Sequence, residues 1–227
     1  DTLTIAKSYV EYEEVPEENH VSGSIFFDDL TGRITSIDND PKLRAGETIV
    51  DASARFMGVG DLSVHAVFPW GKDDQCLTQG YLRKMNLPHL NAMLEPMANM
   101  KIESGDLESL TFKFAYDAIR SKGEVELNYR DLKIISFKDQ DKIDKLRKRD
   151  RNKSDEELKK DNFKTFIINT FVIRKNMTDK VPDEKRTGQI AFQRDTSRSI
   201  FNYWWKSVFS GIKSAYNMED KAGTSAD

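Results

Sequence analysis

Alternation of apolar and polar residues with a period of two dominates the first 75 residues, and it limits what this chain can fold into more than any other feature. The clearest case is DLSVHAVFPW, where Leu62, Val64 and Phe68 fall on one face and Ser63 and His65 on the other. Such a pattern predicts a strand with one buried face. Similar runs follow one another across short Gly, Pro, Asn and Asp clusters, which favours antiparallel pairing. The sequence therefore predicts a mainly β (α+β) fold built on an antiparallel sheet.

The same alternation returns in the second half of the chain. ESLTFKFAY places Phe112 and Phe114 on one face, and GEVELNYRDLKI does the same for Leu127 and Tyr129. Shorter runs, NTFVIRK and GQIAFQR, predict two further strands. Each long run again has one apolar face that needs a cover.

Two segments change to the helical period. NLPHLNAMLEPM predicts a short helix near 87–95 that ends near Pro96. SIFNYWWKSVFSGIKSAY predicts an amphipathic C-terminal helix with Ser199 as its N-cap. The wide aromatic face of this helix needs something to lie on, which is the protein's own sheet, a membrane surface or a lipid-bearing groove.

Composition divides the chain into four stretches. Residues 1–137 read as the β segment, and residues 138–161 are so rich in Lys, Arg, Asp and Glu that we expect an exposed insert. Residues 162–218 are expected to add a helix, strands and the aromatic helix to the same domain. Residues 219–227 are expected to be a disordered tail.

Charge and cysteine content exclude several classes of protein. The net charge of −3 gives no general attraction to nucleic acid, so we expect no nucleic-acid partner. No apolar run is long enough to cross a bilayer, and no signal peptide is visible at the start, which makes the chain look like a piece of a longer protein. Cys76 is the single cysteine and is expected to be a buried strand residue.

The residues that usually carry chemistry are few. His20, His65 and His89 show no metal-ligand spacing, and the nucleophile-elbow and phosphate-loop motifs are absent. GVGD fits a hairpin turn, and the acidic pairs at 28–29 and 38–40 lack the order of an EF-hand. We therefore expect no cofactor, no metal and no enzyme activity, with a hydrolase of unrecognised site as a minor alternative.

Four stretches carry a family resemblance: MNLPHLNAMLEPMANMKIESGDLESLTFKF, GEVELNYRDLKI, FKTFIINTFVIRKN and RTGQIAFQRDTSRSIFNYWWKSVFSGIKSAY. In these the chain resembles the C-terminal part of AsmA-like envelope proteins of the Bacteroidota type. The resemblance implies a periplasmic protein, anchored to the inner membrane by an N-terminal helix outside this sequence. It also implies a curled antiparallel sheet that forms an apolar groove, and the binding or passage of phospholipid acyl chains in maintenance of the outer membrane. The charged insert departs from the family pattern, as does Ala92, where the family pattern has proline.

On this basis the leading hypothesis is a non-enzymatic lipid-binding segment of such a protein. We expect the groove to be lined by Leu62, Val64, Phe68, Phe112, Phe114, Leu127 and Tyr129. We expect Phe201, Trp204 and Trp205 to cap it or to lean on a membrane or an envelope protein. The alternative is a β-rich scaffold or docking module of the cell envelope whose apolar faces are buried and which binds no lipid.

Overall fold

The structure is a computed structural model. It describes residues 1–15, 21–37, 46–71, 75–98, 100–136, 170–172 and 186–216. Outside the described residues lie the predicted insert at 138–161, the predicted tail at 219–227, His20 and the acidic cluster at 38–40.

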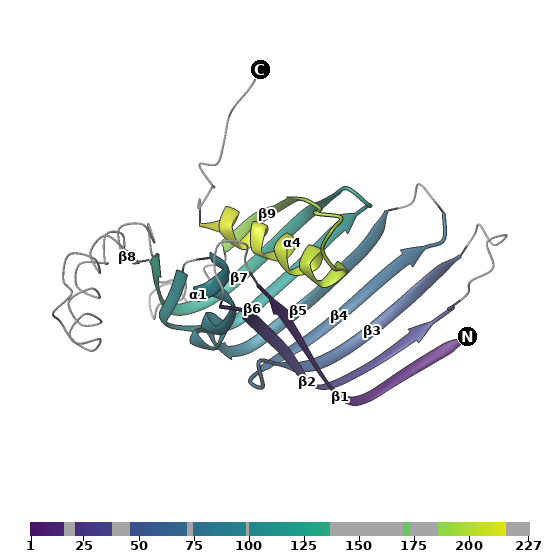
Figure 1. The fold of residues 1–227 in the computed structure, drawn as a ribbon, viewed down its shortest axis with the longest axis horizontal. Helices are drawn as coiled ribbons and strands as arrows, with labels where there is room; N and C mark the ends of the chain where they lie inside the picture. The colour runs from purple at the N-terminus through teal and green to yellow at the C-terminus, as the bar shows by residue number, and fades with distance from the viewer. Residues whose placement is uncertain are drawn as a thin grey trace, which may run out of the picture.

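One antiparallel sheet of nine strands forms the body of the molecule (Figure 1). Its strands are β1 (Thr2–Glu14), β2 (Gly23–Thr35), β3 (Glu47–Phe56), β4 (Gly60–Pro69), β5 (Cys76–Asn86), β6 (Met100–Tyr116), β7 (Arg120–Ser136), β8 (Thr170–Val172) and β9 (Arg186–Gln193). Strands β1 to β7 follow one another in chain order, and β8 and β9 both pair with β7, at different ends of it. The sheet curls without closing, which confirms the predicted mainly β fold with a C-terminal helix.

The register of the strands sorts side chains onto two faces. Val50 pairs with Ala66, Ala66 with Thr78, and Thr78 with Phe114, so a row of inward side chains crosses four strands. The residues between them in sequence point outward, as the alternation predicted. We call the face that carries this row the inner face. All seven predicted groove residues lie on it.

Paired irregularities bend the first two strands. Lys7 in β1 and Asp29 in β2 have positive φ angles of 47° and 50°, and the pairing register shifts beside each. Bulges bend a strand and increase its twist. Beyond these bends the ends of β1 and β2 reach toward the helices, where Gly23 lies against Met93 and Met97.

The short helical segment is longer than predicted. It consists of a 3₁₀ turn, η1 (Leu87–Leu90), followed by α1 (Asn91–Ala98). Pro88 lies in the first turn of η1, where a missing N–H costs nothing. Pro96 lies inside α1 rather than at its end, so the predicted boundary is wrong by two residues.

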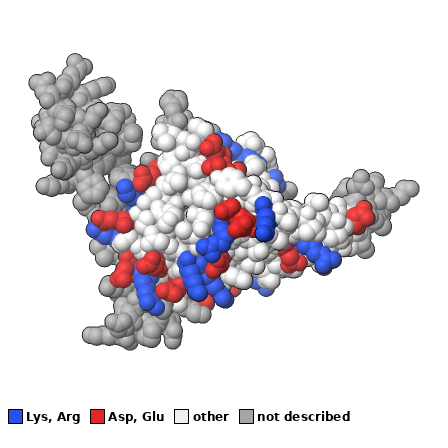
Figure 2. Space-filling model, turned by 90° about the horizontal axis from the view of Figure 1, so that it is seen from below, with Lys and Arg blue, Asp and Glu red and all other residues white. Residues whose placement is uncertain are grey.

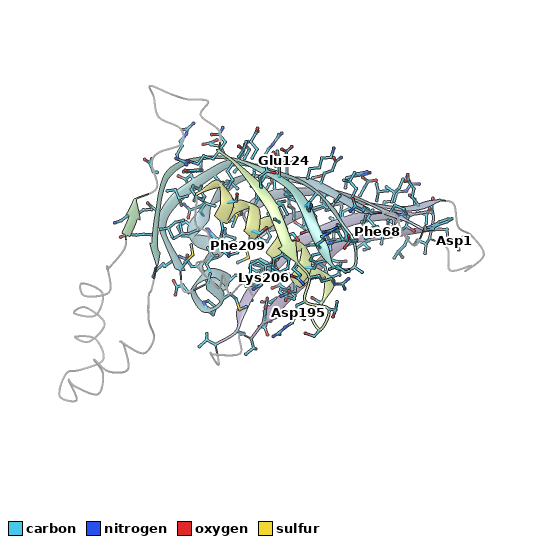
Figure 3. The ribbon with its side chains drawn as sticks, turned by 90° about the horizontal axis from the view of Figure 1, so that it is seen from above. Asp1, Phe68, Glu124, Asp195, Lys206 and Phe209 are labelled. Carbon is cyan, nitrogen blue, oxygen red and sulfur yellow. The ribbon has the colours of Figure 1, made fainter. Side chains whose placement is uncertain are left out.

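The C-terminal helix α4 (Ile200–Ala215) begins at its predicted cap. The Asn202 N–H donates to the Ser199 hydroxyl at 3.2 Å. The helix lies inside the curl of the sheet, while the end of the molecule that carries Asp1 projects away from it (Figure 3). Gly188 and Gly211 permit its close approach, because a Cβ on Gly211 would lie only 2.8 Å from Ile190 and from Val125, and a Cβ on Gly188 would overlap the backbone of α4 at Gly211.

Candidate functional site on the inner face of the sheet

Helix α4 covers the inner face of strands β5, β6, β7 and β9, which we call the covered half. Phe114 is 1% exposed, Tyr129 is 0% exposed, and Leu127 is also buried. These three predicted groove residues therefore belong to the core beneath the helix. The prediction placed them on the right face, but it could not show that α4 fills the curl over them.

The aromatic face of α4 packs on the protein's own sheet. Trp204 lies 6.2 Å from both Phe68 and Tyr116, measured between ring centroids. Phe201 contacts the rings of Tyr12 and Phe27 at 6.3 and 6.4 Å. The apolar stripe is thus only partly buried. Trp204, Trp205, Val208, Phe209 and Ile212 are half-buried and pack against the core, whereas the first turn, at Ile200 and Phe201, is exposed.

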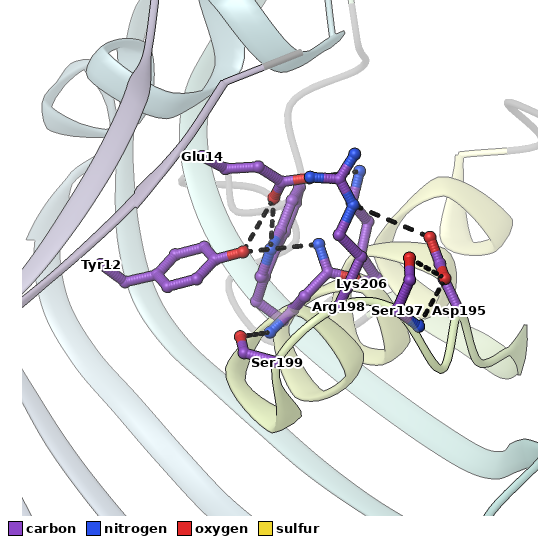
Figure 4. A network of polar contacts seen from close by, with 9 residues as sticks. Tyr12, Glu14, Asp195, Ser197, Arg198, Ser199 and Lys206 are labelled. Carbon is purple, nitrogen blue, oxygen red and sulfur yellow. Dashed lines mark hydrogen bonds and ion pairs between the residues drawn. The ribbon is translucent and has the colours of Figure 1, made fainter. Parts of the chain in front are cut away.

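A buried polar cluster joins the first strand to the last helix (Figure 4). The Glu14 carboxylate accepts hydrogen bonds from the Tyr12 hydroxyl at 3.1 Å and the Trp205 indole N–H at 3.3 Å. The Lys206 ammonium lies 3.9 Å from the same carboxylate, and Asn202 donates to the Tyr12 hydroxyl at 3.4 Å. We call these residues the Glu14 clasp. It holds the end of β1 against α4, a place where no strand pairing closes the sheet.

The inner face of strands β1 to β4 differs from the covered half. Part of this face packs against the core, but one set of its apolar side chains is partly exposed and lies outside the core cluster. We call this set the open face; it consists of Ile5, Leu30, Ile34, Val50, Ala52 and Val64. Leu3, at the edge of the same surface, is 49% exposed. Of the predicted groove residues, Val64 belongs to the open face, whereas Leu62, Phe68 and Phe112 are half-buried and pack against the core.

Three polar groups meet where the open face borders the covered half. The Thr78 hydroxyl, the Tyr116 hydroxyl and the Trp204 indole N–H are buried and have no hydrogen-bond partner among the described residues. Burial raises the pKa of Tyr116 to about 12, while the neighbouring Thr78 hydroxyl and Trp204 indole lower it. Cys76 pairs with Tyr116 across the strands, and burial raises the pKa of its thiol. We call Thr78, Tyr116 and Trp204 the donor cluster.

Local sequence patterns did not indicate the donor cluster. Strand β5 was not predicted beyond Cys76, because Thr78 and Gly80 occupy inward positions that are usually apolar and weaken the alternation. The run of Thr78, Gly80 and Leu82 at every second position was the one sequence signal for strand β5.

The outer face is largely polar, apart from a half-buried apolar row of Ile49, Val67 and Leu77 across β3, β4 and β5. In Figure 2, acidic and basic side chains are interspersed on the face shown, with no expanse of one sign. A shallow depression of about 450 Å³ crosses strands β4 to β7 and β9, with Ser63, His65 and Tyr81 in its lining. His65 Nδ1 lies 2.7 Å from the Asp51 carboxylate, a cross-strand pair that sequence spacing did not suggest. Among the described residues no hydrogen bond joins the Ser63 hydroxyl to this imidazole.

Within the described part of the chain, no three His, Cys, Asp or Glu side chains gather in a way that could hold a metal ion. Over the same residues, no helix has the length and apolarity needed to cross a membrane. Comparison with protein-family models, with curated proteins and with solved structures found no match to this chain.

Proposed function

We propose that this protein binds the acyl chains of membrane lipids on its open face, as a non-enzymatic segment of an AsmA-like envelope protein. The observation that carries the proposal is the contrast within one sheet face. Strands β5, β6, β7 and β9 bury most of their inner side chains under α4, whereas Ile34, Val50 and Val64 remain partly exposed on the same face. A contiguous apolar surface that the described residues leave partly uncovered favours a binding role.

The dimensions of the open face suit an acyl chain. It extends across strands β1 to β4, which lie about 4.8 Å apart, so the surface is about 15 Å wide. Each methylene that leaves water for such a surface gains about 0.8 kcal/mol. No charged side chain belongs to the open face, so apolar contact alone supplies the affinity. The resemblance to AsmA-like proteins supports a periplasmic location and a role in lipid transfer or outer-membrane maintenance.

The second candidate function is a docking module without lipid. The exposed first turn of α4, with Ile200 and Phe201, favours it, together with Ile119 in the turn before β7. The covered half also has the buried faces that this function requires. A docking function without lipid, however, gives the open face no role.

Mass spectrometry of lipids extracted from detergent-free protein tests the proposal. We expect phospholipid in the parent protein and its loss in Ala52→Phe, which fills the open face with a ring. Ser53→Phe is the matched control, because Ser53 is the next residue in β3 and points outward. A parent protein free of lipid, or equal lipid in all three proteins, would contradict acyl-chain binding on the open face.

A further inference from the structure

We propose that the donor cluster binds the ester carbonyl of an acyl lipid whose chain lies on the open face. This inference rests on the proposed function and adds to it the class of ligand and the place of its polar end. The hydroxyls of Thr78 and Tyr116 would donate to the two lone pairs of the carbonyl oxygen, and the indole N–H of Trp204 would donate to the Tyr116 hydroxyl.

The hydroxyls of the donor cluster are buried. Thr78 is 1% exposed and Tyr116 is 4% exposed, so water does not reach their hydroxyls freely. Buried polar groups in folded proteins are nearly always hydrogen-bonded, and leaving one without a partner costs stability. Three such groups at one place, Thr78, Tyr116 and Trp204, therefore indicate an acceptor that the described residues do not supply.

The donor cluster has more hydrogen-bond donors than good acceptors. The Trp204 indole can only donate, whereas each hydroxyl both donates and accepts. If the three groups bonded to one another in a chain, the hydroxyl at its end would still have a proton, with only the weakly accepting Cys76 sulfur beside Tyr116 to receive it. The cluster is thus short of acceptors and fits a carbonyl oxygen, which has two lone pairs and no proton.

Charge decides between a carbonyl and a carboxylate. The cluster contains no cationic side chain, and burying an ionised group without a counter-ion costs far more than three neutral hydrogen bonds return. An uncharged acceptor is therefore favoured. Among acyl lipids this is the ester carbonyl rather than the ionised end of a fatty acid.

The position of the cluster matches an acyl ligand. Thr78 pairs directly with Ala66 of β4, and Ala66 pairs with Val50 of the open face. Phe68, which packs on Trp204, also lies on β4. From β5 the row continues through Val50 and Ile34 to Leu3, a path of about 19 Å at about 4.8 Å per strand. A long chain attached to the bound carbonyl would extend along this row.

The test compares an ester with a hydrocarbon of equal chain length. Methyl palmitate and hexadecane are titrated against the parent protein, with displacement of a fluorescent hydrophobic probe as the signal. We expect the ester to bind about tenfold more tightly, as one or two net hydrogen bonds imply. Equal affinities for the two ligands would overturn binding of the ester carbonyl by the donor cluster, while leaving acyl-chain binding on the open face intact. Binding of neither ligand would overturn both.

Variants assign the difference to the cluster. Tyr116→Phe and Thr78→Val each remove one hydroxyl with little change in shape, and we expect about fivefold weaker ester binding with unchanged hexadecane binding. Because each change also removes a buried group without a partner, the thermal midpoint should stay the same or rise. Thr111→Val, on the exposed outer face of β6, is the control and should change neither measurement.

Two outcomes would contradict the role of these hydroxyls. A lower thermal midpoint in both variants, with the ester preference retained, would mean that the hydroxyls serve folding through a buried water. Tighter binding of palmitate than of methyl palmitate would mean that the cluster accepts a charged group.

Discussion

The covered half and the open face belong to one sheet and one alternating pattern, yet they differ in what lies over them. In the covered half, Phe114, Leu127 and Tyr129 form a core under α4. On the open face, Ile34, Val50 and Val64 have the same chemistry and the same orientation but stay partly exposed. The difference shows that period-two alternation specifies a face that needs a cover, whereas the cover itself depends on a helix far along the chain.

A buried charge in the covered half should have the largest effect. Phe114→Glu places a carboxylate where the side chain is fully enclosed, so we expect a loss of more than about 4 kcal/mol in the free energy of unfolding. Val50→Glu on the open face should cost less than half as much. Urea denaturation followed by circular dichroism measures both. Equal losses would mean that the open face is core as well.

Glycine-to-alanine substitutions compare the two regions with smaller expected losses of stability. A Cβ on Gly188 would overlap the backbone of α4 at Gly211 and Ala215, so Gly188→Ala should cost about 3 kcal/mol. A Cβ on Gly32, in the open region, would meet its nearest atom at 3.4 Å. Gly32→Ala should therefore stay within about 0.5 kcal/mol of the parent, or gain slightly. A small effect at Gly188 would contradict the tight seating of α4.

The Glu14 clasp joins the two regions across the gap that strand pairing leaves. Glu14→Ala removes a buried carboxylate that accepts two hydrogen bonds, and we expect a loss of about 2 kcal/mol. Faster hydrogen exchange should be confined to the end of β1 and the first turns of α4. Glu13→Ala, on the same strand and exposed, is the control. Uniform exchange changes throughout the sheet would count against a local clasp.

The smallest expected effect concerns the edge of the sheet at β9. On β9, the N–H groups of Gln189 and Ala191 donate to the hydroxyls of Ser214 and Ser210 on α4, so the helix covers that edge. Ser210→Ala and Ser214→Ala should each cost about 0.5 kcal/mol, because the freed N–H groups can turn to water. Amide exchange at Gln189 and Ala191 reports the change directly. Unchanged protection there would show that the serines do not cap the edge.

Local patterns in the sequence predicted much of the fold, and the limits of that prediction are physical. The alternation around Leu62 and Phe112 reported the inner face correctly, and the Ser199 cap fixed the start of α4. Contacts between residues far apart in the sequence could not be predicted from such local patterns. The contact between Glu14 and Trp205 joins residues 191 positions apart, and nothing near either residue in sequence indicates the other.

The candidate site was therefore predicted only in part. Alternation cannot separate a groove from a filled core, because both repeat every two residues. Val64 is partly exposed and its role in a groove stays a prediction, whereas Phe114 and Tyr129 are core. The donor cluster escaped prediction because Thr78 belongs to a strand with a weak pattern, and Trp204 reaches it from the C-terminal helix.

Photocrosslinking within the inner face tests the central claim most directly. A photoreactive leucine analogue is placed at Ile34 on the open face or at Leu127 in the covered half, in protein loaded with phosphatidylglycerol vesicles and then separated from them. Both replacements nearly conserve shape, so folding is retained. The account predicts a lipid adduct by mass spectrometry at Ile34 and none at Leu127. An adduct at Leu127 equal to that at Ile34, or no adduct at Ile34, would contradict the division of the inner face into a covered half and an open face.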